Sequence, residues 1–342
     1  MNENVLNMNI LLTSVGRRSY LVDYFRAALD GSGKVVCANM FEHAAGMYAA
    51  DYAVVTSSSS DPRYIHEIVK ICMKYEIGLI FSFHDLDVYI LSQHLDELRK
   101  TGAIPVLPSP EWGRIALDKY ECTCILRDSG FEVPWTTLDF DEASRSLDEG
   151  GLSYPVVVKA RMGFGSQGFS FCHNLDQLKS AYSRAKKEVE AFGTSSYLSC
   201  PVDRGVLIQQ AIHGKEYCVD VVNDLRGNFA CSFMLEVHAM RAGETDMVST
   251  VDPVMAGELP RRFAQLTRHT GIWGVDCMED NGTLRIIDVN PRFTGDYPFH
   301  QIAGANVPAA LIAWARGLES DPVWLRARAG VRAYKDLVPK CV

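Results

Sequence analysis

Short apolar runs alternate with helical patterns through roughly the first hundred residues, and this alternation limits the fold most strongly. The apolar runs are NILLTS, KVVCAN, YAVVT and GLIFSF, and helical patterns occupy residues 19–29, 61–75 and 86–100. Strands that alternate with helices form βαβ units, in which helices cover both faces of a parallel sheet. We therefore expect an α/β domain over residues 1–107, which ends at the proline-rich segment IPVLPSP.

The pattern changes in the second part of the chain. The runs GVLIQQAI, EYCVDVVND and NFACSFMLEVH follow one another with polar turns between them. Consecutive strands of this kind predict an antiparallel sheet. A helix near residues 258–270 precedes two more strands, IWGVDCMED and TLRIIDVN. The whole chain is therefore expected to combine an α/β part with an α+β part.

A glycine-rich segment follows the apolar run VVVK. Gly163, Gly165 and Gly168 have the spacing G-x-G-x-x-G, which in a dinucleotide-binding fold must open a helix. Here FSFC follows the glycines, and an aromatic run of this kind favours a strand. We interpret the segment as a hairpin whose loop can fold over phosphates. Lys159, which ends the first strand, shares a face with Val157 and is placed to contact such a ligand.

Acidic and amide side chains gather near the end of the chain. Asp288, Asn290 and Arg292 occupy alternate positions, and Asp276 lies in the neighbouring predicted strand. Oxygen ligands suit Mg²⁺, which binds a few carboxylates while phosphates and water complete its octahedron. The sequence therefore predicts a magnesium site here, in which Mn²⁺ can replace Mg²⁺.

This magnesium site depends on the register of the two strands. A simple two-residue turn at Asn281 and Gly282 would place Asp276 opposite Ile287, so that Asp276 and Asp288 would face opposite sides of the sheet. The site requires either an odd-numbered loop or a β-bulge between the two acids.

In this order along the chain, the motifs resemble those of the ATP-grasp superfamily, in its carbamoyl-phosphate-synthase-like and carboxylate–amine ligase branch. They are ILLTSVGRRSYLVDYF, the pair Asp118-Lys119, the lysine strand with its glycine loop, LIQQAIHGKEYCVDV, and Asp276 to Arg292. The resemblance implies an ATP-grasp fold with an N-terminal Rossmann-like pre-ATP-grasp domain, residues 1–107. The ATP-grasp domain would be residues 108–342, with a lid at about 130–204 and a C-terminal subdomain at about 205–342.

The resemblance also implies roles for individual residues. The nucleotide would be bound by Lys119, Lys159, Gly163, Gly165, Ser166, Gly168, Gln209, Gln210, Ala211, Ile212 and Glu216. Asp276, Asp288 and Asn290 would bind Mg²⁺, while Arg292 and Lys159 would act on the transferred phosphoryl group. Candidate substrate residues, chosen from their places beside predicted strand ends and loops, are Arg17, Arg18, His84, Asp85, Arg241, Asp296 and Tyr297.

The implied activity is an ADP-forming ligation of a small-molecule carboxylate to an amine or ammonia through an acylphosphate. Three alternatives remain: carbamoyl-phosphate-synthase-like phosphorylation of a carboxylate or carbamate, an NAD(P)-binding oxidoreductase, and a non-catalytic nucleotide sensor. The presence of Lys159, Asp288, Asn290 and Arg292, which would contact the phosphates and the metal ion, argues against a sensor that lacks catalytic activity.

Composition excludes other classes of protein. The net charge of −8 is opposite to that of a general nucleic-acid binder, and no apolar run approaches the ~20 residues of a membrane helix. The ten cysteines are scattered along a long chain, which predicts reduced thiols and a cytoplasmic protein. We consider a homodimer as its assembly.

Overall fold

The first part of the chain forms a parallel five-stranded sheet in the order β3-β2-β1-β4-β5. The computed structural model describes residues 7–163, 168–192, 204–241, 243–336, 338–339 and 341. The strands are β1 (Asn9–Thr13), β2 (Val35–Asn39), β3 (Tyr52–Val55), β4 (Ile77–Ser82) and β5 (Ile104–Pro105). The helices are α1 (Ser19–Leu29), α2 (Ala45–Ala49), α3 (Tyr64–Lys74), α4 (Asp85–Ser92) and α5 (Leu95–Arg99). The predicted α/β domain is confirmed, although the helix expected at residues 86–100 is divided into α4 and α5.

Burial explains why these strands read as continuous apolar runs. Every residue of β2 and all but the first of β1 are buried, because helices cover both faces of the sheet. Strand order reverses between β1 and β4, since β2 lies on one side of β1 and β4 on the other. The loops that follow β1 and β4 therefore border the crevice where open α/β sheets bind ligands.

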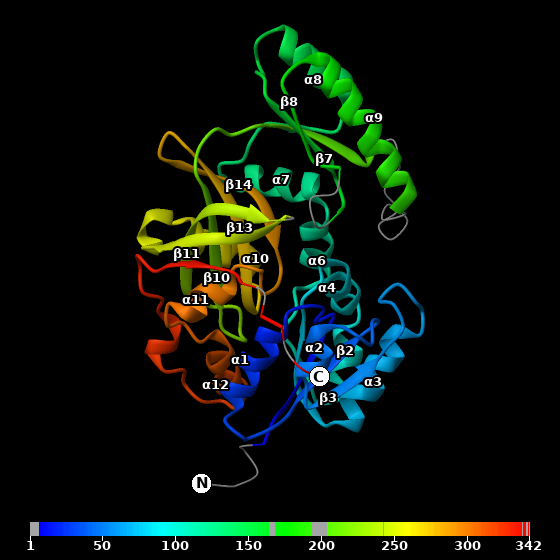
Figure 1. The fold of residues 1–342 in the computed structure, drawn as a ribbon, viewed down its shortest axis with the longest axis vertical. Coiled ribbons are helices and arrows are strands. Elements are labelled where there is room, and N and C mark those ends of the chain that lie inside the picture. Colours follow the sequence, from blue (N-terminus) through cyan, green and yellow to red (C-terminus); the bar gives the residue numbers. More distant parts are fainter. Residues whose placement is uncertain are drawn as a thin grey trace.

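A second sheet forms the lid, which stands at the top of Figure 1. Its order is β6-β9-β7-β8, and α8 (Phe140–Asp148) and α9 (Leu175–Phe192) pack with it. The strands are β6 (Thr136–Thr137), β7 (Val156–Ala160), β8 (Ser170–Cys172) and β9 (Val206–Gln210). Strands β7 and β8 pair antiparallel, as the hairpin interpretation of the glycine segment predicts.

Strand β9 departs from the sequence prediction. We expected its residues to begin the C-terminal sheet, yet β9 pairs antiparallel with β7. The reason is burial, because Val206 and Ile208 pack with Val156 and Val158 in the lid core. The lid sheet therefore extends beyond residue 204.

The third sheet is antiparallel and has the order β14-β13-β10-β11-β12-β15. Its strands are β10 (Glu216–Asn223), β11 (Phe229–Arg241), β12 (Glu244–Val251), β13 (Gly271–Asp280), β14 (Thr283–Asn290) and β15 (Arg332–Tyr334). The other helices of this part are α6 (Pro110–Leu117), α7 (Lys119–Asp128), α10 (Leu259–Thr267), α11 (Tyr297–Ile302) and α12 (Val307–Ala315). Short 3₁₀ helices occupy Pro253–Ala256 and Pro322–Leu325.

A β-bulge sets the register between β13 and β14. The turn has two residues, Asn281 and Gly282, both with positive φ. Cys277 pairs with Ile286, but the next pair is Asp276 with Asp288, so that Ile287 is the additional residue. The bulge condition stated from the sequence is met, and the two carboxylates lie directly opposite each other on one face.

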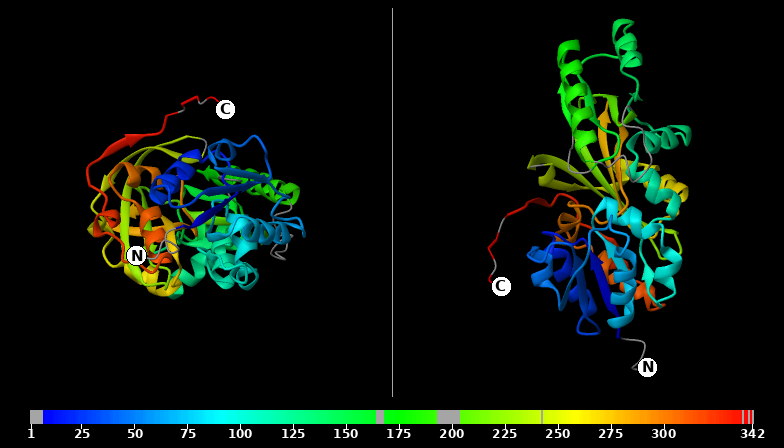
Figure 2. Two further views of the ribbon diagram at one scale, coloured as in Figure 1. Left: turned by 90° about the horizontal axis from the view of Figure 1, so that it is seen from below. Right: turned by 90° about the vertical axis from the view of Figure 1, so that its right-hand side faces the viewer.

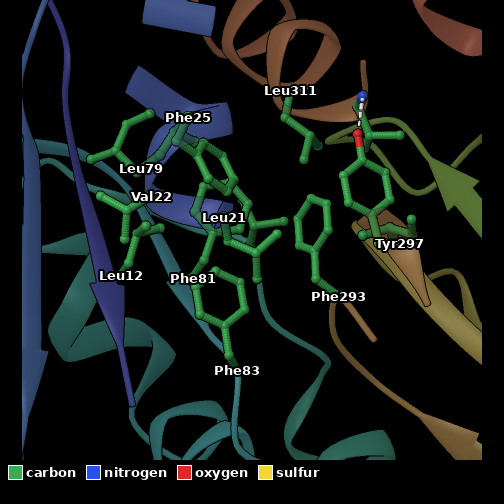
Figure 3. Close-up of a cluster of buried hydrophobic side chains, with 14 of the residues drawn as sticks. Leu12, Leu21, Val22, Phe25, Leu79, Phe81, Phe83, Phe293, Tyr297 and Leu311 are labelled. Atoms are coloured by element: carbon green, nitrogen blue, oxygen red, sulfur yellow. Dashed lines mark hydrogen bonds between the residues drawn. The ribbon is translucent and has the colours of Figure 1, made fainter. Parts of the chain in front are cut away.

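One aromatic cluster joins the parallel-sheet domain to the C-terminal part. Figure 3 shows Phe293 between Phe25, Phe81 and Phe83 on one side and Tyr297 on the other. Helix α12 lies beside α1 in Figure 1, and the side view in Figure 2 shows the lid standing clear of this lower body. The two parts therefore share one core, to which residues from both ends of the sequence contribute.

Tyr297 is part of this core, which corrects its prediction as a substrate residue. Its side chain is fully buried. The Tyr297 hydroxyl donates to Gln301 Oε1 at 2.6 Å and accepts from the Val307 N–H at 2.8 Å. Both hydrogen bonds fix helices α11 and α12, so the hydroxyl serves packing rather than binding.

The shared core predicts a large loss of stability for Phe293→Ala. Phe293 is 2% exposed, and removing its ring leaves a cavity between the two parts, which is expected to cost about 3–5 kcal/mol of unfolding free energy. Denaturant unfolding measures this cost. Phe41→Ala, at a site 66% exposed, is the matched control and is expected to change stability by less than about 0.5 kcal/mol. Equal effects of the two variants would contradict the shared core.

Candidate functional site

A cavity of about 750 Å³ lies where the parallel-sheet domain, the lid sheet and the six-stranded sheet meet. All three parts contribute to its wall. The predicted residues that line it are Arg18, His84, Asp85, Lys119, Lys159, Gly163, Gln209, Gln210, Ala211, Ile212, Glu216, Asp276, Asp288, Asn290, Arg292 and Asp296. The fold thus brings together residues that lie up to 278 positions apart, from Arg18 to Asp296.

Two carboxylates and an amide face the cavity from β13 and β14. The bulge sets Asp276 opposite Asp288, and Asn290 follows on the same face. Asn290 Nδ2 donates to Asp276 Oδ2 at 3.0 Å. Burial, then the nearby Asp296 and Asp288, raise the pKa of Asp276 to about 8. Partly buried acids that lie opposite each other are suited to a divalent cation, which offsets both their repulsion and the cost of burial.

Lys119 contacts this acidic pair from the first turn of α7. Its Nζ donates to the two oxygens of Asp288 at 2.7 and 2.6 Å. Burial alone would lower the pKa of Lys119, but the Asp288 carboxylate outweighs it and the pKa is raised. Helix α7 is capped by Asp118, whose carboxylate also receives two guanidinium nitrogens of Arg161. This ion pair links the start of α7 to the end of β7, the strand that carries Lys159.

Lys159 approaches the same site from the lid. Its Nζ donates to the Ile287 carbonyl at 3.2 Å, so the residue that forms the bulge also receives the second lysine. Burial is the main reason that the pKa of Lys159 falls to about 8; Asp288 opposes this effect and Lys119 adds to it. The ammonium group lacks a carboxylate at salt-bridge distance among the described residues, which suits it to an anionic ligand.

Arg292 forms a two-point ion pair with Asp85. Nε and one terminal nitrogen donate to the two Asp85 oxygens at 2.7 and 2.8 Å, and the guanidinium also donates to Asn290 Oδ1 at 3.2 Å. Burial raises the pKa of Asp85, but the adjacent Arg292 overcomes it and lowers the pKa to about 2. The pair connects the loop after β4 to the end of β14 and holds the guanidinium in one orientation.

Residues predicted to contact the nucleotide base and ribose lie along another wall. Gln209 and Gln210 end β9, and Ala211 and Ile212 follow it. Glu216 begins β10, and burial followed by the charge of Asp296 raises its pKa.

The structure describes only part of the glycine segment. Gly163 lines the cavity, whereas Gly168 does not. Gly168 has a φ of +65°, a conformation that favours glycine, and a Cβ there would approach Ala185 Cβ to 3.2 Å. Gly165 and Ser166 lie outside the described residues.

Two further substrate predictions do not reach the cavity. The side chain of Arg17 is 87% exposed, with Glu244 3.9 Å away. Arg241 lies on the exposed end of β11 and pairs with Asp246 at 2.7 Å. Each of these two arginines therefore lies near a carboxylate at the surface. Arg18, His84, Asp85 and Asp296 of the same predicted group do line the cavity.

Several wall residues were missed by the sequence analysis. Phe169 and Phe171 line the cavity beside the glycine segment, with ring centroids 5.1 Å apart. Their alternate positions in FSFC could have indicated that one strand face carries both rings. Met240, Glu244 and Thr245 reach the cavity through the β11–β12 hairpin, and no local pattern indicates this.

Comparison with known families agrees with this architecture. Residues 116–296 match the family model of the ATP-grasp domain, and residues 10–107 match the model described as PylC-like, N-terminal domain. The chain therefore belongs to the ATP-grasp family, and the fold predicted from its motifs is confirmed.

Solved structures with the same fold cover nearly the whole chain. The biotin carboxylase domain of the 2-oxoglutarate carboxylase from Hydrogenobacter thermophilus, in complex with MgADP, ADP and bicarbonate, superposes with a TM-score of 0.73 at 20% identity. The match covers 91% of this chain and 70% of that one. An N5-carboxyaminoimidazole synthetase from Staphylococcus aureus, in complex with ADP, gives a TM-score of 0.70 at 14% identity over 92% and 81% of the two chains.

Curated relatives are much longer than this chain. The pyruvate carboxylase of Schizosaccharomyces pombe is 25% identical over 281 residues, which are 76% of this chain and 22% of that protein. The carbamoyl phosphate synthase large chain of Bifidobacterium adolescentis is 24% identical over 58% of this chain and 18% of its own length. Among the described residues, no helix is both long and apolar enough to cross a bilayer.

The raised pKa of Asp276 predicts a pH-dependent gain in stability for Asp276→Asn. Between the ordinary carboxyl pKa and about 8, the folded protein binds a proton that the unfolded chain has released, so this group lowers stability as the pH rises through that range. Asparagine removes the effect. Without metal or nucleotide, the unfolding temperature of the variant should exceed that of the wild type by a few degrees at about pH 8.5 and much less at about pH 4.

Thermal unfolding in a chelator at the two pH values measures the difference. Asp96→Asn is the control, because the Asp96 side chain is 90% exposed. A gain for Asp276→Asn that is equal at both pH values would contradict the burial of an uncompensated acid at this position.

Proposed function

We propose that this protein is an ATP-dependent, ADP-forming ligase that joins a small-molecule carboxylate to an amine or ammonia. The observation that carries the proposal is the convergence of Lys119, Lys159, Asp276, Asp288 and Arg292 on one cavity. Two ammonium groups, two carboxylates and a fixed guanidinium are the groups that phosphoryl transfer requires. The MgADP and ADP complexes of the structural neighbours named above support the same interpretation.

The residues fit magnesium and a nucleotide. Asp276, Asp288 and Asn290 would hold Mg²⁺, and the observation that supports this assignment is the pair of partly buried carboxyl groups placed directly opposite each other. Gln209, Gln210, Ala211 and Ile212 would border the base, and Glu216 the ribose. Bound MgATP would supply a phosphoryl group to the substrate carboxylate, giving an acylphosphate that the amine converts to an amide with release of phosphate.

The two lysines and Arg292 would neutralise charge during this transfer. Lys119 donates to Asp288 beside the proposed metal site, where its ammonium group would also reach phosphate oxygens. Lys159 is held beside Asp288 by the Ile287 carbonyl. Arg292 is held by Asp85 and needs little reorientation, which is how fixed charges stabilise a transition state.

The lid would exclude water from the acylphosphate. Strands β7 and β8 contribute to one side of the cavity, and Phe169 and Phe171 present apolar rings toward it. An acylphosphate hydrolyses in water, so a cover that closes over it protects the amide-forming step.

Other functions receive less support. Antiparallel pairing of β7 with β8 disfavours an NAD(P)-binding oxidoreductase, whose glycine motif must connect a strand to a helix. Carbamoyl-phosphate-synthase-like phosphorylation of a carboxylate or carbamate would use the same residues and differ only in the acceptor. The acceptor amine, the carboxylic acid and a homodimeric assembly all stay predictions.

The proposed chemistry predicts ADP and phosphate as products. When carboxylate and amine pairs are screened with MgATP, the active pair should release ADP and inorganic phosphate in equal amounts, with an amide detected by mass spectrometry. Release of AMP and pyrophosphate would contradict the acylphosphate route. ADP release with a carboxylate or bicarbonate but no amide would favour the phosphorylation alternative.

Lys159→Met should lower ATP turnover with that pair by at least about 100-fold, because a buried charge that stabilises the transferred phosphoryl group is lost. Initial rates of ADP release measure the effect. Lys215→Met is the matched control, since the Lys215 side chain is 59% exposed and pairs with Glu236 on the surface. Near-normal turnover of Lys159→Met, or an equal loss in Lys215→Met, would contradict the assignment.

A further inference from the structure

Two neighbouring arginines after β1 have opposite environments. The side chain of Arg17 is 87% exposed and points to the surface, where Glu244 lies 3.9 Å away. Arg18 is partly buried and lines the cavity. Among the residues that the structure describes, the Arg18 guanidinium has no carboxylate at salt-bridge distance and forms no hydrogen bond; Glu244 and Asp85 act on it only from farther away. It is therefore a cation in the cavity wall whose donors are available to a ligand.

The loop that carries Arg18 is held in one conformation. The Arg18 N–H donates to the Val15 carbonyl at 3.0 Å, and the Gly46 N–H donates to the Gly16 carbonyl at 2.9 Å. Val15 is fully buried, and a Cβ at Gly46 would lie only 2.5 Å from its methyl groups. These contacts hold the backbone of the loop from which Arg18, and not Arg17, reaches the cavity.

Arg18 also stands at the strand-order reversal of the parallel sheet. It follows β1, and Asp85 follows β4, the strand on the opposite side of the reversal. Asp85 neutralises Arg292 by two hydrogen bonds. Arg18 and Arg292 line the same cavity, and burial followed by the charge of Arg292 lowers the pKa of Arg18, yet a guanidinium stays charged at neutral pH. The pair of arginines with one carboxylate thus has one positive charge in excess.

We propose that Arg18 is the residue that binds the carboxylate of the substrate and holds it beside Arg292 for phosphorylation. Arg18 lines the cavity without a carboxylate at salt-bridge distance among the described residues, so its charge can pair with one carboxylate of a ligand, and a guanidinium can hold both carboxylate oxygens. This inference rests on the proposed function for the chemistry that follows binding, but anion binding by Arg18 is measurable without turnover. The proposal assigns this role to Arg18 and not to Arg17, although the sequence analysis predicted both as substrate residues.

Calorimetric titration tests the proposal on the full chain. The probes are acetate, succinate, glycine and L-glutamate, each added with a saturating non-hydrolysable ATP analogue and Mg²⁺. MgADP is titrated separately. The variants are Arg18→Ala, Arg18→Lys and the matched control Arg17→Ala. Thermal unfolding checks that all three fold, which is expected because neither side chain takes part in the core.

At least one carboxylate should bind the wild type and Arg17→Ala with dissociation constants that agree within about twofold. Arg18→Ala should weaken this binding by at least about tenfold, since a charged hydrogen-bonded pair is lost. Arg18→Lys should be intermediate, because it keeps the charge and loses the two-point contact. MgADP should bind all four proteins equally. With an active substrate pair, Arg18→Ala should raise KM for the carboxylate and leave KM for ATP unchanged.

Three results would overturn the proposal. They are equal carboxylate binding by Arg18→Ala and wild type, an equal loss in Arg17→Ala, and the failure of every probe to bind wild-type protein that binds MgADP. With any of these three results, normal MgADP binding would still support the proposed nucleotide site. Failure of MgADP to bind the wild type would instead contradict the proposed function, while carboxylate binding that depends on Arg18 would still support the anion site.

Discussion

The β-bulge at Ile287 is the constraint on which the rest of the site depends. With regular pairing from the two-residue turn onward, Asp276 and Asp288 would lie on opposite faces of the sheet. The additional residue returns Asp288 to the face of Asp276 and turns its own carbonyl toward Lys159. Lys119 then bonds to Asp288 from α7. One irregular position therefore aligns the acids of the six-stranded sheet with lysines from two other elements.

The cavity is built between parts of the chain that share a core. Phe293 packs against aromatic rings of the parallel-sheet domain, and Arg292, the residue before it, pairs with Asp85 of that domain. Packing and ion pairing thus reinforce each other at adjacent positions. The lid is joined differently, since Arg161 and Asp118 form its link to α7 beside the two lysines. The lid is therefore joined to the rest of the molecule by an ion pair close to the two lysines.

Much of the fold could be predicted because the local patterns were strong. The alternation of strands and helices, the hairpin around the glycines and the strands that carry Asp276 and Asp288 all follow from apolar periodicity. The prediction was wrong for β9, because Val206 and Ile208 suit either sheet and only packing against β7 selects one. Tyr297 was misjudged for a similar reason, since its nearness to β14 in sequence does not show which way its ring points.

The sequence by itself determined the family, the order of the elements and the residue types available for nucleotide and metal, because these depend on local periodicity and motif spacing. It also showed that the turn at Asn281-Gly282 required an irregularity, without showing where. Tertiary structure decided that a bulge at Ile287 supplies it, that Asp85 pairs with Arg292, and that Arg18 rather than Arg17 faces the cavity. Those outcomes depend on contacts between residues far apart in the chain, and such contacts leave no pattern in the sequence next to each residue.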